Sequence, residues 1–142
     1  MVENLSKSRT EIFTFPPVGV GCRSSDKLEI IGPPVIGASW EGFVIENLLA
    51  VAPPHTTASF YRTARGAEID LVLEMGGKHG IWAVEIKHSP SAPLQKGYRI
   101  ALDDIQPSRA FLVHSGTDRF PKGEGVEAIG LAELMQELQR LE

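Results

Sequence analysis

The sequence contains a single cysteine, Cys22, among its 142 residues. One thiol excludes an internal disulfide and a cysteine-built zinc site, and the four scattered His residues exclude a zinc finger. No apolar run approaches the ~20 residues of a membrane-spanning helix, and the first residues, MVENLSKSRTEIF, lack the apolar segment of a secretory signal. We therefore expect a cytoplasmic protein without membrane contact, in which any metal site is built from carboxylates.

An excess of positive charge is also absent, because the net charge is −4. The surface as a whole does not attract polyanions, so any contact with nucleic acid is expected to be local. Basic residues do gather at 62–65 and 87–99, where the alternative interpretation is an ordinary solvated surface. The length and the 42% hydrophobic content fit one compact domain.

The pattern divides the chain near residue 35. Residues 1–35 mix Pro and Gly with short apolar pieces and are expected to be irregular, whereas residues 36–142 are expected to form the domain. Helical spacing and alternating β-rich runs predict helices at 36–52, 92–105 and 131–142, and strands at 59–62, 67–75, 80–88, 109–115 and 126–130. This order predicts an α/β fold with a mixed central sheet flanked by helices on both faces.

Charged residues interrupt the predicted hairpin in the middle of the domain. In the strand WAVEIKH, residues 82–88, side chains alternate between faces, so Glu85 and Lys87 share one face. If Met75 pairs with Gly80 at the turn, Asp70 lies directly opposite Glu85. Two facing carboxylates destabilise a ladder unless a cation lies between them.

A third acid, Glu41, falls in the middle of the apolar arc of the first predicted helix, where burial is costly. Three acids and Lys87 would leave an internal ion-pair network net negative. Mg²⁺ or Mn²⁺ would balance that charge, and Lys87 would then orient water or stabilise charge on a phosphate. Spacing alone favours the ion-pair network, whereas the strand context and Glu41 favour the metal site.

Three ordered blocks of sequence resemble the domain-of-unknown-function family DUF4143. They are Gly37–Val44 (GASWEGFV), Phe60–Thr63 through Gly66–Leu71 (FYRT and GAEIDL), and Val84–Ser89 (VEIKHS). The resemblance runs from about Leu28 to the C-terminus. This domain typically forms the C-terminal part of bacterial and archaeal AAA-type ATPases and is similar to the PD-(D/E)xK superfamily, which implies a restriction-endonuclease-like fold for residues 36–142.

The resemblance implies two groups of site residues. Asp70, Glu85 and Glu41 would be metal-binding and catalytic acids for Mg²⁺ or Mn²⁺, and Lys87 would be the catalytic lysine. The implied function is a metal-dependent nuclease. The candidate nucleic-acid contacts are Arg62, Arg65, Gln95 and Lys96.

Other functions remain open at this point. The sequence has no G-x-x-x-x-G-K-[ST] phosphate loop, so it lacks the ATPase with which this domain usually occurs. The same fold would also serve as a non-catalytic module that docks nucleic acid, protein or an AAA-type ATPase. A truncated remnant is a third interpretation, and a homodimer is plausible because nucleases of this superfamily often pair.

Overall fold

The computed structural model describes residues 10–14 and 39–141. Within these residues, one seven-stranded sheet has the order β1-β2-β3-β4-β5-β7-β6, and three helices pack on it. The elements are β1 (Thr10–Thr14), α3 (Ser39–Val51), β2 (Thr57–Thr63), β3 (Glu68–Gly76), β4 (Gly80–Ile86), α4 (Lys96–Ile105), β5 (Arg109–His114), β6 (Phe120–Gly123), β7 (Val126–Gly130) and α5 (Leu131–Gln139). None of these helices is long and apolar enough to cross a membrane.

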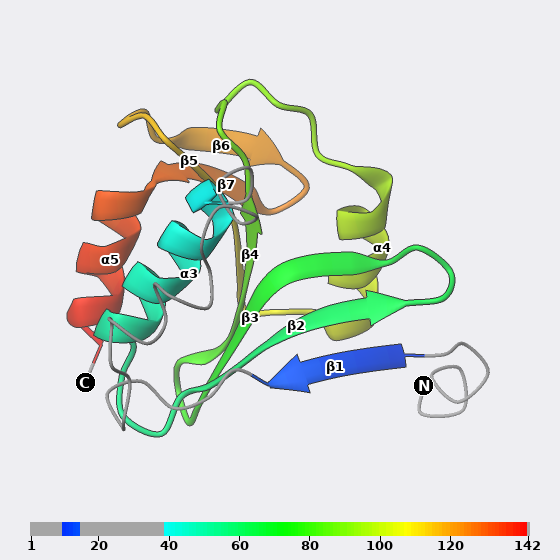
Figure 1. Cartoon of the computed structure of the whole chain (residues 1–142), viewed down its shortest axis with the longest axis horizontal. Coiled ribbons are helices and arrows are strands. Elements are labelled where there is room, and N and C mark those ends of the chain that lie inside the picture. The colour runs from blue at the N-terminus through cyan, green and yellow to red at the C-terminus, as the bar shows by residue number, and fades with distance from the viewer. Residues whose placement is uncertain (1–9, 15–38, 142) are drawn as a thin grey trace.

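The helices cover both faces of the sheet (Figure 1). Helices α3 and α5 pack side by side on one face, where Val44, Leu48 and Leu138 meet apolar side chains of the strands. Helix α4 covers the other face through Tyr98 and Ala101. Strands β1 to β4 pair antiparallel, β4, β5 and β7 pair parallel, and β6 returns antiparallel. The predicted mixed sheet with helices on both faces is therefore confirmed.

The β3–β4 ladder has the register that the sequence predicted. Leu71 faces Val84 and Leu73 faces Trp82, so Asp70 and Glu85 occupy the next facing positions of the same register. Only the turn differs, because Gly76 rather than Met75 faces Gly80. Gly76 has a φ of 72°, a left-handed conformation that an L side chain rarely adopts.

Two strands were not predicted. Strand β1 falls within the segment 1–35 that was expected to be irregular, and the other residues of that segment lie outside the described ones. Strand β6 is short, contains Pro121 and lies at a sheet edge, where both features are common but leave no alternating pattern to detect. Helix α4 begins at Lys96 instead of residue 92, because Gln95 has an extended backbone and caps it.

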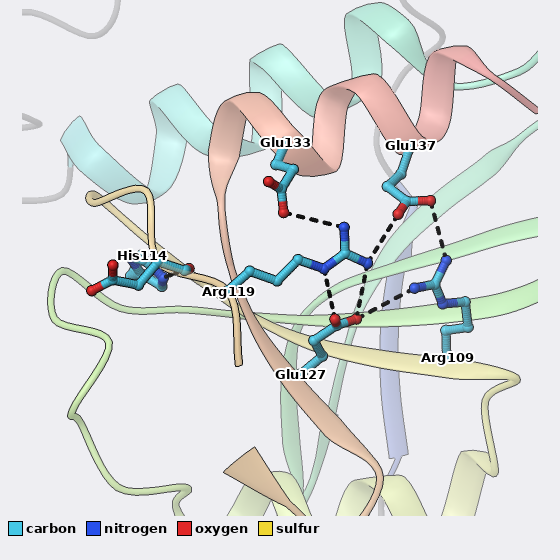
Figure 2. A network of polar contacts seen from close by, with 7 residues as sticks. Arg109, His114, Arg119, Glu127, Glu133 and Glu137 are labelled. Carbon is cyan, nitrogen blue, oxygen red and sulfur yellow. Dashed lines mark hydrogen bonds and ion pairs between the residues drawn. The ribbon is translucent and has the colours of Figure 1, made fainter. Parts of the chain in front are cut away.

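A network of ion pairs connects α5 to the sheet (Figure 2). Arg119 donates to Glu127 of β7 at 2.6 Å, and to Glu133 and Glu137 of α5 at 3.1 and 2.9 Å. Arg109 of β5 lies 3.4 Å from Glu127 and 3.5 Å from Glu137. Partial burial alone would raise the pKa of the Glu137 carboxyl, but the two guanidinium groups lower it overall. The helix therefore relies on charge as well as on its apolar face.

Buried His114 organises the loop that carries Arg119. Its Nδ1 accepts the Gly116 backbone N–H at 3.0 Å, and its Nε2 lies 2.8 Å from the Asp118 carbonyl oxygen. Because a backbone N–H only donates, Nδ1 is the acceptor and Nε2 carries the proton. The imidazole is thus a structural link between β5 and the loop.

Candidate acidic site

Asp70 lies in a β-bulge. The pairs Ser59 with Val72 and Tyr61 with Ile69 leave two residues of β3, Asp70 and Leu71, opposite a single residue of β2. A bulge bends a strand and redirects the side chains within it. The Asp70 Oδ2 atom accepts the Ile86 backbone N–H at 2.9 Å, which fixes this carboxylate against the end of β4.

Glu85 is buried beside Asp70, with 4% of its surface exposed. Burial, the Asp70 charge and a hydrogen bond between the two carboxyl groups raise the pKa of Glu85 to about 8. Beneath it, the Tyr98 hydroxyl lies 3.0 Å from the Phe111 carbonyl oxygen and 3.2 Å from that of Ala83. Burial and the nearby Glu85 charge raise the pKa of this phenol, so Tyr98 stays protonated. Its buried side chain packs beneath the site.

Lys87, which directly follows β4, completes the predicted cluster. Its Nζ atom is 3.6 Å from Glu85 Oε2, and 27% of its side chain is exposed. Its backbone is fixed on two sides, because its N–H donates to the Val113 carbonyl at 2.9 Å and its carbonyl accepts Trp40 Nε1 at 3.0 Å. The ammonium group therefore stands between the buried carboxyl and solvent.

Glu41 reaches the cluster from the first turn of α3. The sequence predicted that this side chain would be buried in the middle of an apolar face, and that prediction was wrong because Glu41 is exposed. Glu41 borders an open pocket, although Trp40 beside it in the first turn of α3 packs against the core. Partial desolvation, followed by the Asp70 and Glu68 charges, raises the pKa of Glu41, while Lys87 and Arg62 act in the opposite direction.

The pocket has a volume of about 340 Å³. It opens between α3 and the bulged part of the sheet. Its lining residues are Glu41, Ile45, Phe60, Arg62, Glu68, Ile69 and Asp70. Arg62 is therefore the predicted nucleic-acid contact that reaches the pocket, where its NH2 atom lies 3.7 Å from Glu68 Oε1.

Glu68 was not singled out from the sequence. Strict alternation would place Glu68 on the same face as Asp70 and Val72. In the structure, Ile69 and Val72 both belong to the cluster beneath α4, so the bulge changes the alternation between them. Glu68 joins the wall of the pocket. Alternation from Asp70 therefore indicates Glu68, since both side chains line the pocket. The bulge, which leaves no mark in the apolar pattern, changes only how these two residues lie relative to Val72.

The three other predicted nucleic-acid contacts are exposed near the same end of the sheet. Arg65 lies in the β2–β3 turn, and Gln95 and Lys96 lie at the start of α4. A Cβ atom at Gly97 would collide with the Gly66 carbonyl oxygen, so this turn and the start of α4 are in close contact. None of the three lines the pocket.

The acidic residues do not form a ready-made three-ligand metal site. Across residues 10–14 and 39–141, no group of three or more His, Cys, Asp or Glu side chains is arranged to hold a metal ion. Among the acids, Asp70 is the one whose charge does most to raise the pKa of Glu85. Any ion bound there would rely on this pair.

Fold and site together define an α/β domain with an acidic pocket at one end of a mixed sheet. The chain belongs to the family described as Domain of unknown function (DUF4143), whose model matches residues 36–134. It is 38% identical over 104 residues to Uncharacterized protein Rv2008c of Mycobacterium tuberculosis and, equally, to Uncharacterized protein Mb2031c of Mycobacterium bovis. The match covers 73% of this chain but only 23% of each of these curated relatives. No solved structure matches the chain, so the restriction-endonuclease-like fold stays a prediction.

Proposed function

We propose that this domain hydrolyses phosphodiester bonds of nucleic acid with the help of Mg²⁺ or Mn²⁺. The observation that carries the proposal is the buried Glu85, whose pKa the neighbouring Asp70 charge helps to raise, with the Lys87 ammonium 3.6 Å from Glu85 Oε2. Of these three residues, Asp70 lines a pocket that is open to solvent. Paired acids and a lysine beside an accessible pocket are the parts that this reaction requires.

The donor set fits such an ion. Mg²⁺ prefers oxygen ligands and usually takes one or two protein carboxylates while keeping several waters. Four acidic and two basic side chains influence one another here, so the site is net negative when all are ionised. A bound divalent cation would supply Lewis acidity and a water of lowered pKa. Asp70 and Glu85 would hold the ion, and Glu41, which lines the pocket, would assist by binding a water.

Each other residue has a role that follows from its place. Lys87, held between Glu85 and solvent, would stabilise the charge that develops on the phosphate. Arg62, inside the pocket, would contact a phosphate oxygen. The exposed side chains of Arg65, Gln95 and Lys96 would contact the backbone of the nucleic acid farther along the same end of the sheet.

Isothermal titration with Mn²⁺ and Mg²⁺ tests the metal site, comparing wild type with Asp70→Asn at low salt. We expect heat of binding for the wild type and at least about tenfold weaker binding for the variant, because the substitution removes one of two anionic ligands. If neither protein gives heat with either ion, the metal site is refuted.

Cleavage assays test the reaction itself, with single-stranded, double-stranded and branched DNA and with RNA as substrates. Lys87→Ala should lower the rate by about 100-fold or more. Lys78→Ala is the matched control, because Lys78 is an exposed lysine in the β3–β4 turn at the opposite end of β4. Equal rates in the wild type and Lys87→Ala would show that the activity comes from a contaminant and would overturn the proposal.

A second candidate is favoured by the length of the relatives. Since the match covers only 23% of them, a domain of this kind occurs within a much larger chain. We propose as the alternative a non-catalytic module that docks nucleic acid or protein, including an AAA-type ATPase. Co-purification of the tagged chain with an ATPase, together with no cleavage in the assays above, would favour this candidate. A monomer without a partner at micromolar concentration would count against it.

A further inference from the structure

Three aromatic rings form a row beside the acidic site. The Trp40 and Phe43 ring centroids are 6.0 Å apart with planes inclined by 26°, and those of Trp40 and His88 are 5.6 Å apart and inclined by 28°. Trp40 is therefore stacked between the other two rings. Both outer rings are exposed, and Phe43, at 54%, is the only exposed large hydrophobic residue among those that the structure describes.

This row is joined directly to the residues of the site. Trp40 precedes Glu41 in the chain, His88 follows Lys87, and Trp40 Nε1 donates to the Lys87 carbonyl at 3.0 Å. The Trp40 side chain thus stacks with both other rings and also binds the backbone of Lys87. A single exposed Phe would need no explanation, but a stacked row fixed to charged site residues does.

We propose that this ring row, Phe43–Trp40–His88, stacks an unpaired base of single-stranded nucleic acid whose phosphates lie toward Lys87 and Arg62. The ligand class rests on the proposed function. Ring faces bind bases of any sequence, and the neighbouring ammonium and guanidinium groups complement the phosphates. The row and the cations therefore match the two chemical parts of one nucleotide strand.

Single strands fit this surface better than duplexes. In a duplex the base faces are already occupied by stacking, whereas an unpaired strand presents them. Proteins usually hold duplex backbones with a broad basic surface, and a net charge of −4 does not favour such a surface here. Stacking on the ring row would therefore supply affinity that charge alone does not.

The test uses single-stranded DNA containing 2-aminopurine, titrated with the full chain in EDTA so that no cleavage occurs. Stacking on the ring row should quench the fluorescence. Phe43→Ala should weaken binding by about tenfold and reduce the quenching, and Phe43→Tyr, which keeps a ring, should restore both. Absence of quenching with the wild type, or equal binding by Phe43→Ala, would overturn the proposal.

Further measurements separate this proposal from that of hydrolysis. Quenching by the wild type without cleavage under any metal condition would refute hydrolysis and leave the ring row standing. Cleavage accompanied by unchanged quenching in Phe43→Ala would refute the ring row alone. Sedimentation of the free protein adds one check, since a wild-type dimer that Phe43→Ala converts to a monomer would assign the row to a second copy and overturn the proposal.

Discussion

At the scale of single residues, Glu85 connects stability to pH. Its pKa of about 8 lies above the 4.5 of an ordinary glutamate, chiefly because of burial and then because of Asp70. Between these two values the folded protein binds a proton that the unfolded chain has released. The free energy of unfolding therefore falls as the pH rises through this window, and the stability is fully present below it.

Glu85→Gln should remove this dependence, because the amide cannot ionise. As the pH rises from about 5 to about 9, we expect the free energy of unfolding of the wild type to fall by on the order of 2 to 4 kcal/mol more than that of the variant. Urea unfolding at several pH values, without divalent ions, measures the difference. Parallel curves for the two proteins would show that Glu85 titrates normally.

The sequence predicted how Asp70, Glu85 and Lys87 meet, because strand alternation and a short hairpin turn determine which side chains face one another. It did not single out Glu68, although alternation places this residue on the same face as Asp70 and both line the pocket. It misjudged the burial of Glu41 because helical spacing gives the direction of a side chain but not what lies opposite it. The contact between Trp40 and Lys87 joins distant elements, and no local pattern predicts such a bond.

At the scale of elements, the position of α4 depends on a backbone contact. Gly97 packs so closely against the Gly66 carbonyl that a methyl group would not fit. The apolar spacing of α4 predicted which face packs on the sheet, and Tyr98 and Ala101 are indeed buried. How near its first turn approaches β2 and β3 depends on tertiary packing, which spacing does not reveal.

Gly97→Ala should destabilise the protein by about 1 to 3 kcal/mol, since the obstacle is backbone and cannot rotate away. Gly42→Ala is the matched control in α3, because a Cβ atom there meets nothing within 4 Å. Removing a helix-interior glycine should stabilise the fold by about 0.5 to 1 kcal/mol. Thermal unfolding of both variants checks the opposite signs, and a neutral Gly97→Ala would contradict the close contact.

At the scale of the whole molecule, the number of available cations limits how nucleic acid can bind. The ion-pair network of α5 already engages Arg109 and Arg119 with three glutamates. The cations that act on Glu41 in the acidic site are Lys87 and Arg62, and the net charge of −4 opposes long-range attraction. Affinity must come from short-range contacts.

The salt dependence of binding should accordingly be shallow. If Arg62, Arg65, Lys87 and Lys96 each neutralise one phosphate of a single strand, log K should fall with log salt at a slope of about −3. Fluorescence titrations with a single-stranded oligonucleotide across a range of KCl concentrations measure this slope. A slope near about −8 would reveal a wide basic surface and contradict the local contact described above.

The parallel pairing of β4 with β5 also sets the order in which the acidic site is built on the ribosome. The hairpin with Asp70 and Glu85 leaves the exit tunnel first, whereas the Val113 carbonyl that anchors the Lys87 backbone follows only after α4. A parallel neighbour requires such a crossover before it can pair. The two acids are therefore brought together by a local hairpin, whereas the backbone of the lysine is fixed by a strand that lies beyond α4 in the chain.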